Sequence, residues 1–468
     1  MIILGTNSIK DTGFDVANSC RFNEASADSL HRATGETTGA TNWTLSTWIK
    51  RSTLGSLTNG GTFMGWYSAT NKRSVFGFND SDKLYWWSDN GSGTQGDATT
   101  AAVFRDSAWY HVVLRIDTTQ SSQSDRVKIY VNNVEQSLTF SGSHPTQNEA
   151  NTGMYGASYI GSSFYNTATD RHFGGYLAET VMIDDASLNP DQFAEADENS
   201  SIWKPIDVSG LTFGSDGFYL DYKDSSALGN DANGSNNLTV TNLTAIDQST
   251  STCTNNFCTI NSLDNFYAAA TLAEGNLKVT CNAGNTSFIT GTFGLTKGKW
   301  YWEGKLTTVG GEEAIGITDI VSTATNNYAG QTANSYTFQG NNGNIRNNDG
   351  NTSYGSAYGT SVIGVYMDLD NNKLYFAING TIQNSGTGFN ITDPTSTTNG
   401  FYFPMVGDVD SDAPVWEVNF GNPVSALSSA VADANGYGSF EYDPSAGTFD
   451  SASKDFLAIC TKNLAEYG

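Results

Sequence analysis

The strongest constraint on this chain is a set of short apolar runs that alternate with polar residues and end in turn dipeptides. The clearest is residues 362–381, VIGVYMDLDNNKLYFAINGT. Its apolar positions alternate on both sides of Asp370-Asn371-Asn372, residue types that tolerate a left-handed backbone. Asn379-Gly380 is a strong hairpin dipeptide. The stretch therefore predicts two paired strands followed by a second turn.

The same pattern occurs earlier, where WYHVVLRID at residues 109–117 is followed, after a polar loop, by VKIYVNN at residues 127–133. Two such units far apart in 468 residues predict two domains, since all-β domains commonly run to about 200–250 residues each. The 49 glycines are typical of sheets joined by many turns, and long helical periodicity is nearly absent. The sequence therefore predicts an all-β fold of two antiparallel β-sandwiches in tandem.

Further runs predict individual strands and their buried faces. WTLSTWIK at residues 43–50 has apolar residues on both faces, as in a strand inside a stack of two sheets. Trp300 and Trp302 share one strand face and are predicted to lie in the core.

Charge and cysteine usage narrow the possible partners. With 23 Lys and Arg against 48 Asp and Glu, the net charge of −25 disfavours nucleic acid and anionic membranes. Five scattered cysteines predict free, buried or incidental thiols. Cys253 and Cys258 could also form a small disulfide loop or half of a metal site, although no second Cys/His pair accompanies them. The apolar run in the opening MIILGTNSIKDTG is too short for the core of a signal peptide. No membrane insertion is expected. Synthesis in a host cytoplasm follows as an expectation.

A first family resemblance covers roughly residues 14–200. Its features are Phe22 with Ser29-Leu30, WTLSTWIKR, WYHVVLRID, VKIYVNN, YIGSS and the ending GYLAETVMIDDASLNPDQF. In this order they resemble a laminin-G-like or concanavalin A-like jelly roll. In the ending, Asn189 and Pro190 predict the cap and first position of a short closing helix.

A second resemblance covers about residues 268–424, where KWYWE, LYFAINGT, YFPMV and VNFG resemble a SPRY domain. The usual SPRY partners are peptides held by loops at one end of the sandwich. The segment at 255–264 and the tail at 435–442 and 456–464 resemble those of bacteriophage virion proteins with this architecture. The expected division is an arm at 1–20, a jelly roll at 21–200, a linker region at 201–267, a SPRY-like sandwich at 268–425 and a tail at 426–468, with part of the linker pairing back on a sandwich.

No catalytic constellation is found. Glucanases on the jelly-roll fold need two carboxylates on one strand face, and no Glu-x-Asp-x-x-Glu run is present. The four histidines are isolated, and His111 is expected to be a packed strand residue. The loop Asp408–Asp412 resembles the start of a calcium loop, yet Ala413 and Asn419 stand where Gly and Glu are needed. The expectation is a protein that is not an enzyme and has no metal or other cofactor, with calcium as the alternative.

Aromatic residues supply the candidate binding sites. Trp86 and Trp87 are adjacent in a strand, so only one is expected to enter the core, and the other offers a platform for a sugar ring or for a neighbouring subunit. In the second half, four tyrosines lie among Asn, Gly and Ser, a mixture that binding loops use. These four candidates are Tyr328, Tyr336, Tyr354 and Tyr358.

The functional expectation is a bacteriophage virion protein, in a tail fibre, spike or capsid surface, that binds host surface glycan or protein without catalysis. Other virion proteins are its expected partners, it is expected to form a homo-oligomer, and its place is the virion surface. The first alternative is a decoration or joining protein that contacts only other virion subunits. A more distant alternative is an enzyme that degrades polysaccharide.

Overall fold

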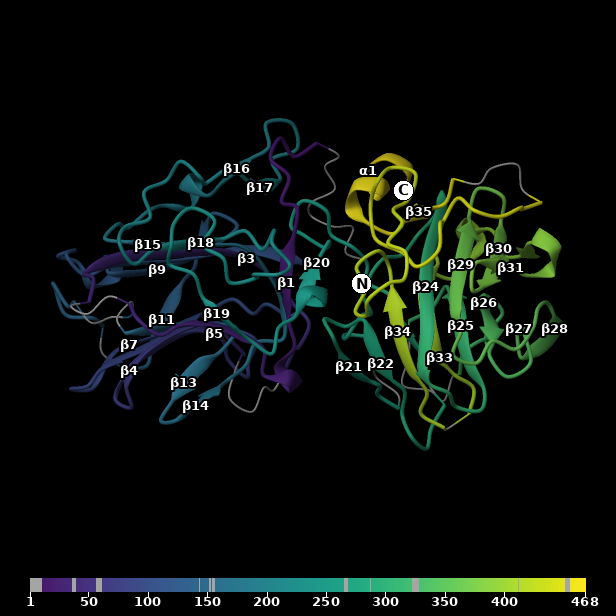
Figure 1. Cartoon of the computed structure of the whole chain (residues 1–468), viewed down its shortest axis with the longest axis horizontal. Helices are drawn as coiled ribbons and strands as arrows, with labels where there is room; N and C mark the ends of the chain where they lie inside the picture. The colour runs from purple at the N-terminus through teal and green to yellow at the C-terminus, as the bar shows by residue number, and fades with distance from the viewer. Residues whose placement is uncertain are drawn as a thin grey trace. The chain divides into compact units, whose positions relative to one another are not determined.

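A computed structural model describes residues 11–35, 39–55, 61–142, 144–150, 153, 156–264, 268–286, 288–321, 328–410, 412–450 and 455–468. These residues form two compact units, which divide between Thr254 and Asn255. Each unit contains two large sheets that pack face to face, as Figure 1 shows.

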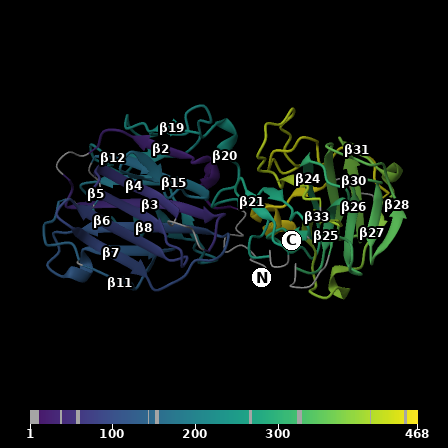
Figure 2. The same ribbon diagram turned by 90° about the horizontal axis from the view of Figure 1, so that it is seen from below.

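The first unit contains two eight-stranded sheets. In the β3 sheet the order is β10 (Val134–Glu135), β9 (Val127–Val131), β8 (Trp109–Asp117), β3 (Asn42–Arg51), β15 (Gly175–Asp184), β1 (Ser19–Phe22) and β20 (Gln248–Ser249), with β18 (Phe218–Leu220) also on β15. In the β5 sheet the order is β11 (Leu138–Phe140), β7 (Thr94–Thr100), β6 (Leu84–Asn90), β5 (Lys72–Phe78), β4 (Gly61–Ala69), β12 (Ala157–Ile160), β2 (Ser29–Arg32) and β19 (Thr239–Thr241). Figure 2 shows β11, β7, β6 and β5 side by side.

Two small hairpins complete the first unit. They consist of β13 (Ser163–Tyr165) with β14 (Ala168–Asp170), and β16 (Ala194–Ala196) with β17 (Trp203–Pro205). The predicted closing helix is a single 3₁₀ turn, Pro190–Gln192, with Asn189 at its cap and Pro190 at its first position. The chain then enters β16, so the helix predicted from the ending is wrong beyond this first turn.

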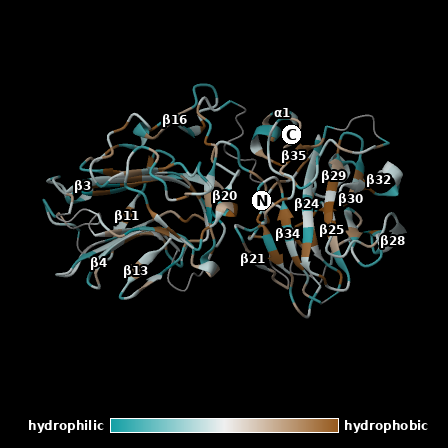
Figure 3. Cartoon of the chain, viewed as in Figure 1, coloured by the Kyte–Doolittle hydropathy of each residue, from teal (hydrophilic) through white to brown (hydrophobic). Residues whose placement is uncertain are grey.

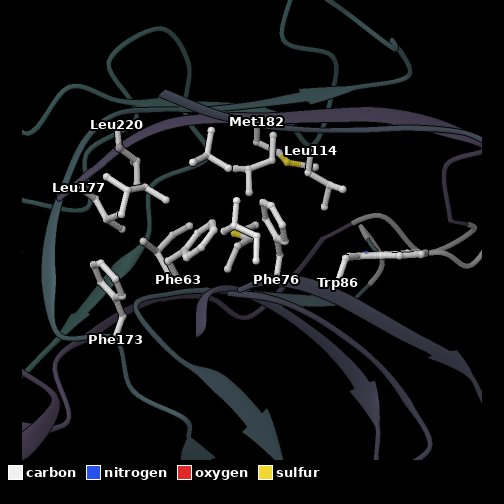
Figure 4. Packing of buried hydrophobic residues seen from close by; sticks show 14 of the residues in the cluster. Phe63, Phe76, Trp86, Leu114, Phe173, Leu177, Met182 and Leu220 are labelled. Carbon is white, nitrogen blue, oxygen red and sulfur yellow. The ribbon is translucent and has the colours of Figure 1, made fainter. Parts of the chain in front are cut away.

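The core of the first unit lies between its two sheets. Phe63 and Phe76 point from the β5 sheet toward Leu114 and Met182 of the β3 sheet, and Trp86 lies in the same core (Figure 4). Strand β3 is buried along nearly its whole length, because Trp43 and Leu45 enter this core while Trp48 packs in a second cluster on the opposite face. The prediction of apolar residues on both faces of this strand is confirmed.

Residues 201–254 belong to the first unit, although this part of the chain was expected to lie in a linker region. Part of the span pairs back on the first sandwich, as predicted: β18 pairs with β15, β19 with β2 and β20 with β1. Each of these strands has only two or three residues. Such runs are too short to show a periodicity, so the unit ends later than the sequence indicated.

The second unit also contains two sheets. In the β24 sheet the order is β21 (Thr271–Ala273), β22 (Lys278–Thr280), β34 (Val415–Asn419), β24 (Lys299–Thr308), β29 (Val362–Asp368), β30 (Lys373–Ile378) and β31 (Thr381–Ile382), with β32 (Phe389–Asn390) on β30 and β35 (Leu457–Ala458) parallel to β24. In the β25 sheet the order is β23 (Phe288–Thr290), β33 (Phe403–Asp408), β25 (Glu313–Thr318), β26 (Ser335–Gln339), β27 (Asn344–Asn347) and β28 (Gly350–Ser353). Helix α1 (Thr461–Tyr467) is the single α-helix of the described residues.

The hairpin predicted at residues 362–381 is confirmed. Strands β29 and β30 pair over their full lengths, and Asn372 at the turn has a left-handed φ of 54°. Asn379 and Gly380 follow with φ of 46° and 75°, the signs that a type I′ turn requires, and β31 then pairs back on β30. Figure 3 shows parts of β29 and β34 in brown, the colour of hydrophobic residues.

The β24 sheet is buried on both faces, because its strand residues alternate between two clusters. Trp300 and Trp302 point into the core between the sheets, which confirms their predicted place. Tyr301 points to the other face, where Phe440 and Phe456 from the C-terminal segment cover it. The region expected to be a tail therefore packs on the body of the second unit.

Candidate functional site

The two adjacent tryptophans of β6 point in opposite directions. The side chain of Trp86 is fully buried and lies among the core residues of the first unit (Figure 4). Trp87 points to the outer face of the β5 sheet and is only partly buried. The prediction that one of the pair enters the core is confirmed. The candidate binding role of Trp86 is corrected, because a side chain enclosed between two sheets has no surface to offer a ligand.

Three of the four candidate tyrosines are core residues of the second unit. Tyr336, Tyr354 and Tyr358 are only 4–6% exposed. The rings of Tyr354 and Tyr358 contact Phe338, and the Tyr358 hydroxyl donates a hydrogen bond to the Phe338 carbonyl oxygen (3.0 Å). Their binding role is corrected as well. The polar residues next to these tyrosines in sequence did not keep the rings at the surface. Burial of the large apolar ring is more favourable than its exposure to water.

Tyr328 remains partly exposed in the second unit. Its hydroxyl donates a hydrogen bond to Asp349 Oδ1 (2.5 Å), and the guanidinium carbon of Arg346 lies 4.9 Å from its ring centroid. Arg346 also forms ion pairs with Asp349 (3.0 Å) and Glu312 (3.5 Å). The polar atoms around Tyr328 are thus paired with one another, which leaves few of them for a ligand.

Trp87 lies in a groove on the outer face of the β5 sheet. The groove has a volume of about 350 Å³ and is lined by Arg73, Val75, Tyr85, Trp87, Asp97 and Arg171. Five of these residues come from three neighbouring strands, where alternate positions share a face. The register places Val75 opposite Trp87 and Trp87 opposite Asp97, in one row across β5, β6 and β7. We call this hollow the Trp87 groove.

Two aromatic rings hold the guanidinium of Arg73 in the Trp87 groove. Its central carbon lies 5.0 Å from the Trp87 ring centroid and 4.1 Å from that of Tyr165. Such cation–π contacts favour a fixed orientation of the charged group. Burial and the positive charge of Arg171 lower the pKa of Arg73, while Asp170 raises it. No hydrogen bond or ion pair joins Arg73 to another residue in the described part of the chain.

Arg171 enters the groove from the end of the β13–β14 hairpin. It has a left-handed φ of 54°, and its carbonyl oxygen accepts a hydrogen bond from the Thr62 N–H of β4 (2.8 Å). Its Nη1 donates to the Tyr85 hydroxyl (3.2 Å), and its Nε lies 3.8 Å from Asp170 Oδ2. The backbone contact with β4 therefore fixes the point from which this side chain reaches the groove.

The β13–β14 hairpin also covers the neighbouring part of the same face. Phe164 packs on Tyr67 of β4 and Tyr159 of β12, with ring centroids 4.6 and 5.3 Å apart. Gly65 of β4 allows this close approach, because a side-chain carbon at that position would lie 2.9 Å from the Ser162 carbonyl oxygen. The hairpin thus forms a wall beside the open part of the sheet.

Other buried ionisable groups have structural partners. His111 Nδ1 accepts a hydrogen bond from Trp203 Nε1 (3.0 Å), so in the neutral ring Nε2 carries the proton and donates to Ser46 Oγ (2.8 Å). Burial lowers its pKa to about 3, so the ring is neutral. This confirms His111 as a packed strand residue.

Glu303 is a buried carboxylate beside a second cavity, of about 380 Å³, in the second unit. Burial raises its pKa, although four hydrogen bonds oppose that effect. The donors are the N–H groups of Glu441 and Tyr442, the Tyr301 hydroxyl and Asn419 Nδ2, at 2.8–3.0 Å. Glu303 therefore fastens the C-terminal segment to β24.

The acidic loop at the end of β33, residues 408–412, is the segment whose sequence resembles the start of a calcium loop. Its Ser411 lies outside the described residues. Burial and the nearby Asp412 and Glu312 carboxylates raise the pKa of Asp410, while the Asp412 N–H donates a hydrogen bond to it and lowers that pKa. In the part of the chain that the structure describes, no three His, Cys, Asp or Glu side chains are grouped so as to hold a metal ion.

Sequence reasoning identified Trp87 but missed the other polar residues of its groove. Tyr85 and Trp87 are two positions apart and share a face, so the alternation in β6 was a signal for Tyr85. Arg73 and Asp97 required the pairing register, and Arg171 required the path of the β13–β14 hairpin. Neither the pairing register nor the path of the hairpin can be predicted from the residues of a single strand.

Known families and structures resemble each unit separately. Residues 25–193 match the concanavalin A-like lectin/glucanases superfamily in its laminin G form, and residues 299–408 match the SPRY domain. The crystal structure of the SPRY domain of human HERC1 is 13% identical in sequence, and the match covers 32% of this chain and 91% of the HERC1 chain, with a TM-score of 0.26. A heptameric SAP-like pentraxin from Limulus polyphemus is 14% identical in sequence, and the match covers 38% of this chain and 80% of the pentraxin chain, with a TM-score of 0.29. No curated protein sequence matches the chain.

No helix in the described ranges is both long and apolar enough to span a membrane. The strand order and the family matches agree on tandem antiparallel β-sandwiches, as the sequence predicted. The chain therefore contains a concanavalin A-like domain of the laminin G type followed by a SPRY domain.

Proposed function

We propose that this chain is a non-enzymatic binding protein whose concanavalin A-like domain recognises a saccharide in the Trp87 groove. The observation that carries the proposal is the partly exposed indole of Trp87, set among polar groups in a hollow of about 350 Å³. That volume is near the lower end of the roughly 300–1,000 Å³ typical of small-molecule sites.

The chemistry of the groove matches a sugar ring. An indole offers apolar area to the C–H face of a pyranose and an N–H donor at its edge. Asp97 accepts hydrogen bonds and Arg171 donates them, and a sugar's hydroxyl groups can form both kinds. Trp87 and Asp97 stand on adjacent, hydrogen-bonded strands, and a backbone hydrogen bond from Thr62 of β4 fixes the point from which Arg171 reaches the groove. The three groups therefore keep their spacing without a ligand.

A binding role without catalysis is supported by the number of carboxylates in the groove. Glycoside hydrolysis by the usual mechanisms needs two carboxyl groups on either side of the bond. Asp97 is the one carboxylate among the lining residues, and its side chain accepts a hydrogen bond from the Ser141 hydroxyl. This favours a lectin-like role over polysaccharide degradation.

We further propose that the protein is part of a bacteriophage virion, at its surface, where it binds host surface glycan. The tandem arrangement, the resemblance of residues 255–264 and of the C-terminal segment to phage virion proteins, and the net charge of −25 support this proposal. Other virion proteins would be its partners, and a homo-oligomer would present several weak sugar sites together. The alternative is a decoration or joining protein in which Trp87 packs on another virion subunit.

The test is binding of the purified full chain, presented multivalently, to a glycan array and to intact candidate host cells. Trp87→Ala is compared with Tyr328→Ala in the second unit and with Tyr130→Ala, a partly exposed tyrosine on the other sheet of the first unit. Circular dichroism verifies that each variant is folded. We expect saturable binding that Trp87→Ala abolishes and the other two variants retain.

Absence of binding by the wild-type chain would refute the saccharide proposal and favour the decoration role. Loss of binding in Tyr328→Ala alone would move the site to the SPRY domain.

A further inference from the structure

We propose that the Trp87 groove selects an acidic saccharide, a pyranose carrying a carboxylate, whose anionic group is bound by Arg73 and Arg171. This inference rests on the proposed function and adds the chemical class of the ligand. Its basis is the presence of two guanidinium groups in one groove of a chain that carries 48 acidic and 23 basic residues.

Arg73 has no carboxylate partner at hydrogen-bond distance among the described residues, although the charge of the nearby Asp170 favours its protonated form. Its neighbours on both sides are aromatic rings, Trp87 and Tyr165, which hold the group in place without supplying a hydrogen-bond acceptor. Asp89 lies opposite Arg73 in the strand register, but its Oδ1 accepts a hydrogen bond from the Gly91 N–H (2.8 Å). Within the described residues no ion pair of Arg73 is formed.

Arg171 is only weakly paired. Its contact with Asp170 is long, 3.8 Å, and its other partner, the Tyr85 hydroxyl, is neutral. The side chain of Arg171 is 29% exposed, so it can reach a ligand in the groove. Two positive groups that face the same hollow repel each other, and an anion between them removes that repulsion.

The remaining lining residues indicate a sugar acid over a simple anion. Trp87, which is only partly buried, provides apolar area that inorganic phosphate or sulfate cannot use, while a pyranose ring can cover it. Asp97 repels an anion placed close to it but accepts hydrogen bonds from hydroxyl groups. The groove thus separates an acceptor at Asp97 from donors at the two arginines. A ring that carries hydroxyls and one carboxylate matches this separation.

The experiment measures binding of two matched pairs of probes by isothermal titration calorimetry. The acidic probes are α1,4-linked tetragalacturonate and sialyllactose; the neutral probes are the carboxyl-reduced forms of the same two saccharides. We expect at least one acidic probe to bind about tenfold to a hundredfold more tightly than its neutral counterpart, the range for hydrogen bonds to a charged group. Inorganic sulfate and acetate are included to measure binding of the anion alone.

Variants locate the effect. Arg73→Gln and Arg171→Gln should each reduce affinity for the acidic probe by about tenfold or more and leave neutral-probe affinity unchanged, whereas Trp87→Ala should reduce both. Arg73→Lys keeps the charge but loses the planar fork, so partial retention is expected. Lys223→Gln removes a positive charge from an exposed site outside the groove and serves as the matched control, with unchanged affinity.

Equal affinity for both members of each pair, or loss of acidic-probe affinity in Lys223→Gln but not in Arg73→Gln, would overturn the acidic-saccharide inference and leave the proposed function standing. Tight binding of sulfate or acetate alone would also overturn it. If no saccharide of either class binds, both proposals fail together.

Discussion

Replacement of Glu179 by Gln should stabilise the first unit at alkaline pH and not at acidic pH. Glu179 sits at a β-bulge in β15, with a left-handed φ of 48°, and is only 5% exposed. Burial raises its pKa from 4.5 to about 7, although the Tyr219 hydroxyl, which donates a hydrogen bond to its Oε2 (2.5 Å), opposes this rise. The folded state therefore binds the proton more tightly than the unfolded state.

The sign and size of the effect follow from this difference. The stabilising contribution of protonated Glu179 is complete below pH 4.5 and is lost as the pH rises through about 7. At about 1.4 kcal/mol per pH unit, the loss amounts to about 3 kcal/mol of unfolding free energy. Gln has the shape of the neutral acid, retains an oxygen that accepts from Tyr219, and does not ionise. The variant should therefore equal the wild type near pH 4 and exceed it by about 3 kcal/mol near pH 8.

The assay is urea unfolding at about pH 4 and about pH 8, followed by pulse proteolysis with mass spectrometry of peptides from β3 and β15. A probe local to the first unit is needed because a chain of two units need not unfold in one transition. Glu195→Gln, whose side chain is 58% exposed, is the control and should differ little from the wild type at either pH. An equal gain for Glu179→Gln at both pH values, or a loss of stability at pH 8, would refute the linkage to Glu179.

Three further outcomes are expected. Glu303→Gln should destabilise the second unit by about 2–3 kcal/mol at neutral pH, because each carboxylate oxygen of Glu303 accepts two hydrogen bonds and the NH₂ group of Gln would point at two of these donors. Urea unfolding measures the change, and an unchanged midpoint would contradict it. Asp82→Asn should destabilise the first unit by about 3–5 kcal/mol, because it leaves buried Arg51 (ion pair of 2.9 Å) without its counter-charge, while the exposed Glu195→Gln again serves as control. All five cysteines are buried and none forms a disulfide, so a thiol reagent should label none in the native chain and five after unfolding; fewer than five would reveal a disulfide.

Much of the fold could be predicted from local pattern. The hairpins at 109–131 and 362–382 pair as their alternating residues and turn dipeptides indicated. Trp300 and Trp302 lie in the core for the same reason. Such features depend on residues that are close in sequence, whose chemistry is read without knowing the rest of the chain. The prediction of buried thiols without a disulfide is confirmed as well.

The candidate site was less accessible to prediction. Of six aromatic residues proposed to bind, Trp87 and Tyr328 remain partly exposed, while the other four lie in cores. In β6 the alternation separates Trp86 from Trp87 but does not say which of them faces the second sheet. Polar sequence neighbours likewise failed to predict exposure for Tyr354, because its ring packs on Phe338 and Phe376, which come from other strands.

The sequence by itself therefore determined the fold class, the main strands and turns, and the presence of two sandwiches, since each follows from residue spacing and backbone preference. Only the tertiary structure decided which residues meet at the Trp87 groove. Strand register placed Trp87 and Asp97 in one row, with Arg73 two positions from that row on the same face. The backbone hydrogen bond from Thr62 brought Arg171 to that face as well. The physical reason is that register and hairpin placement are set by packing over the whole sheet, and a change of one residue in the register of a strand would move that strand's groove side chains to the other face.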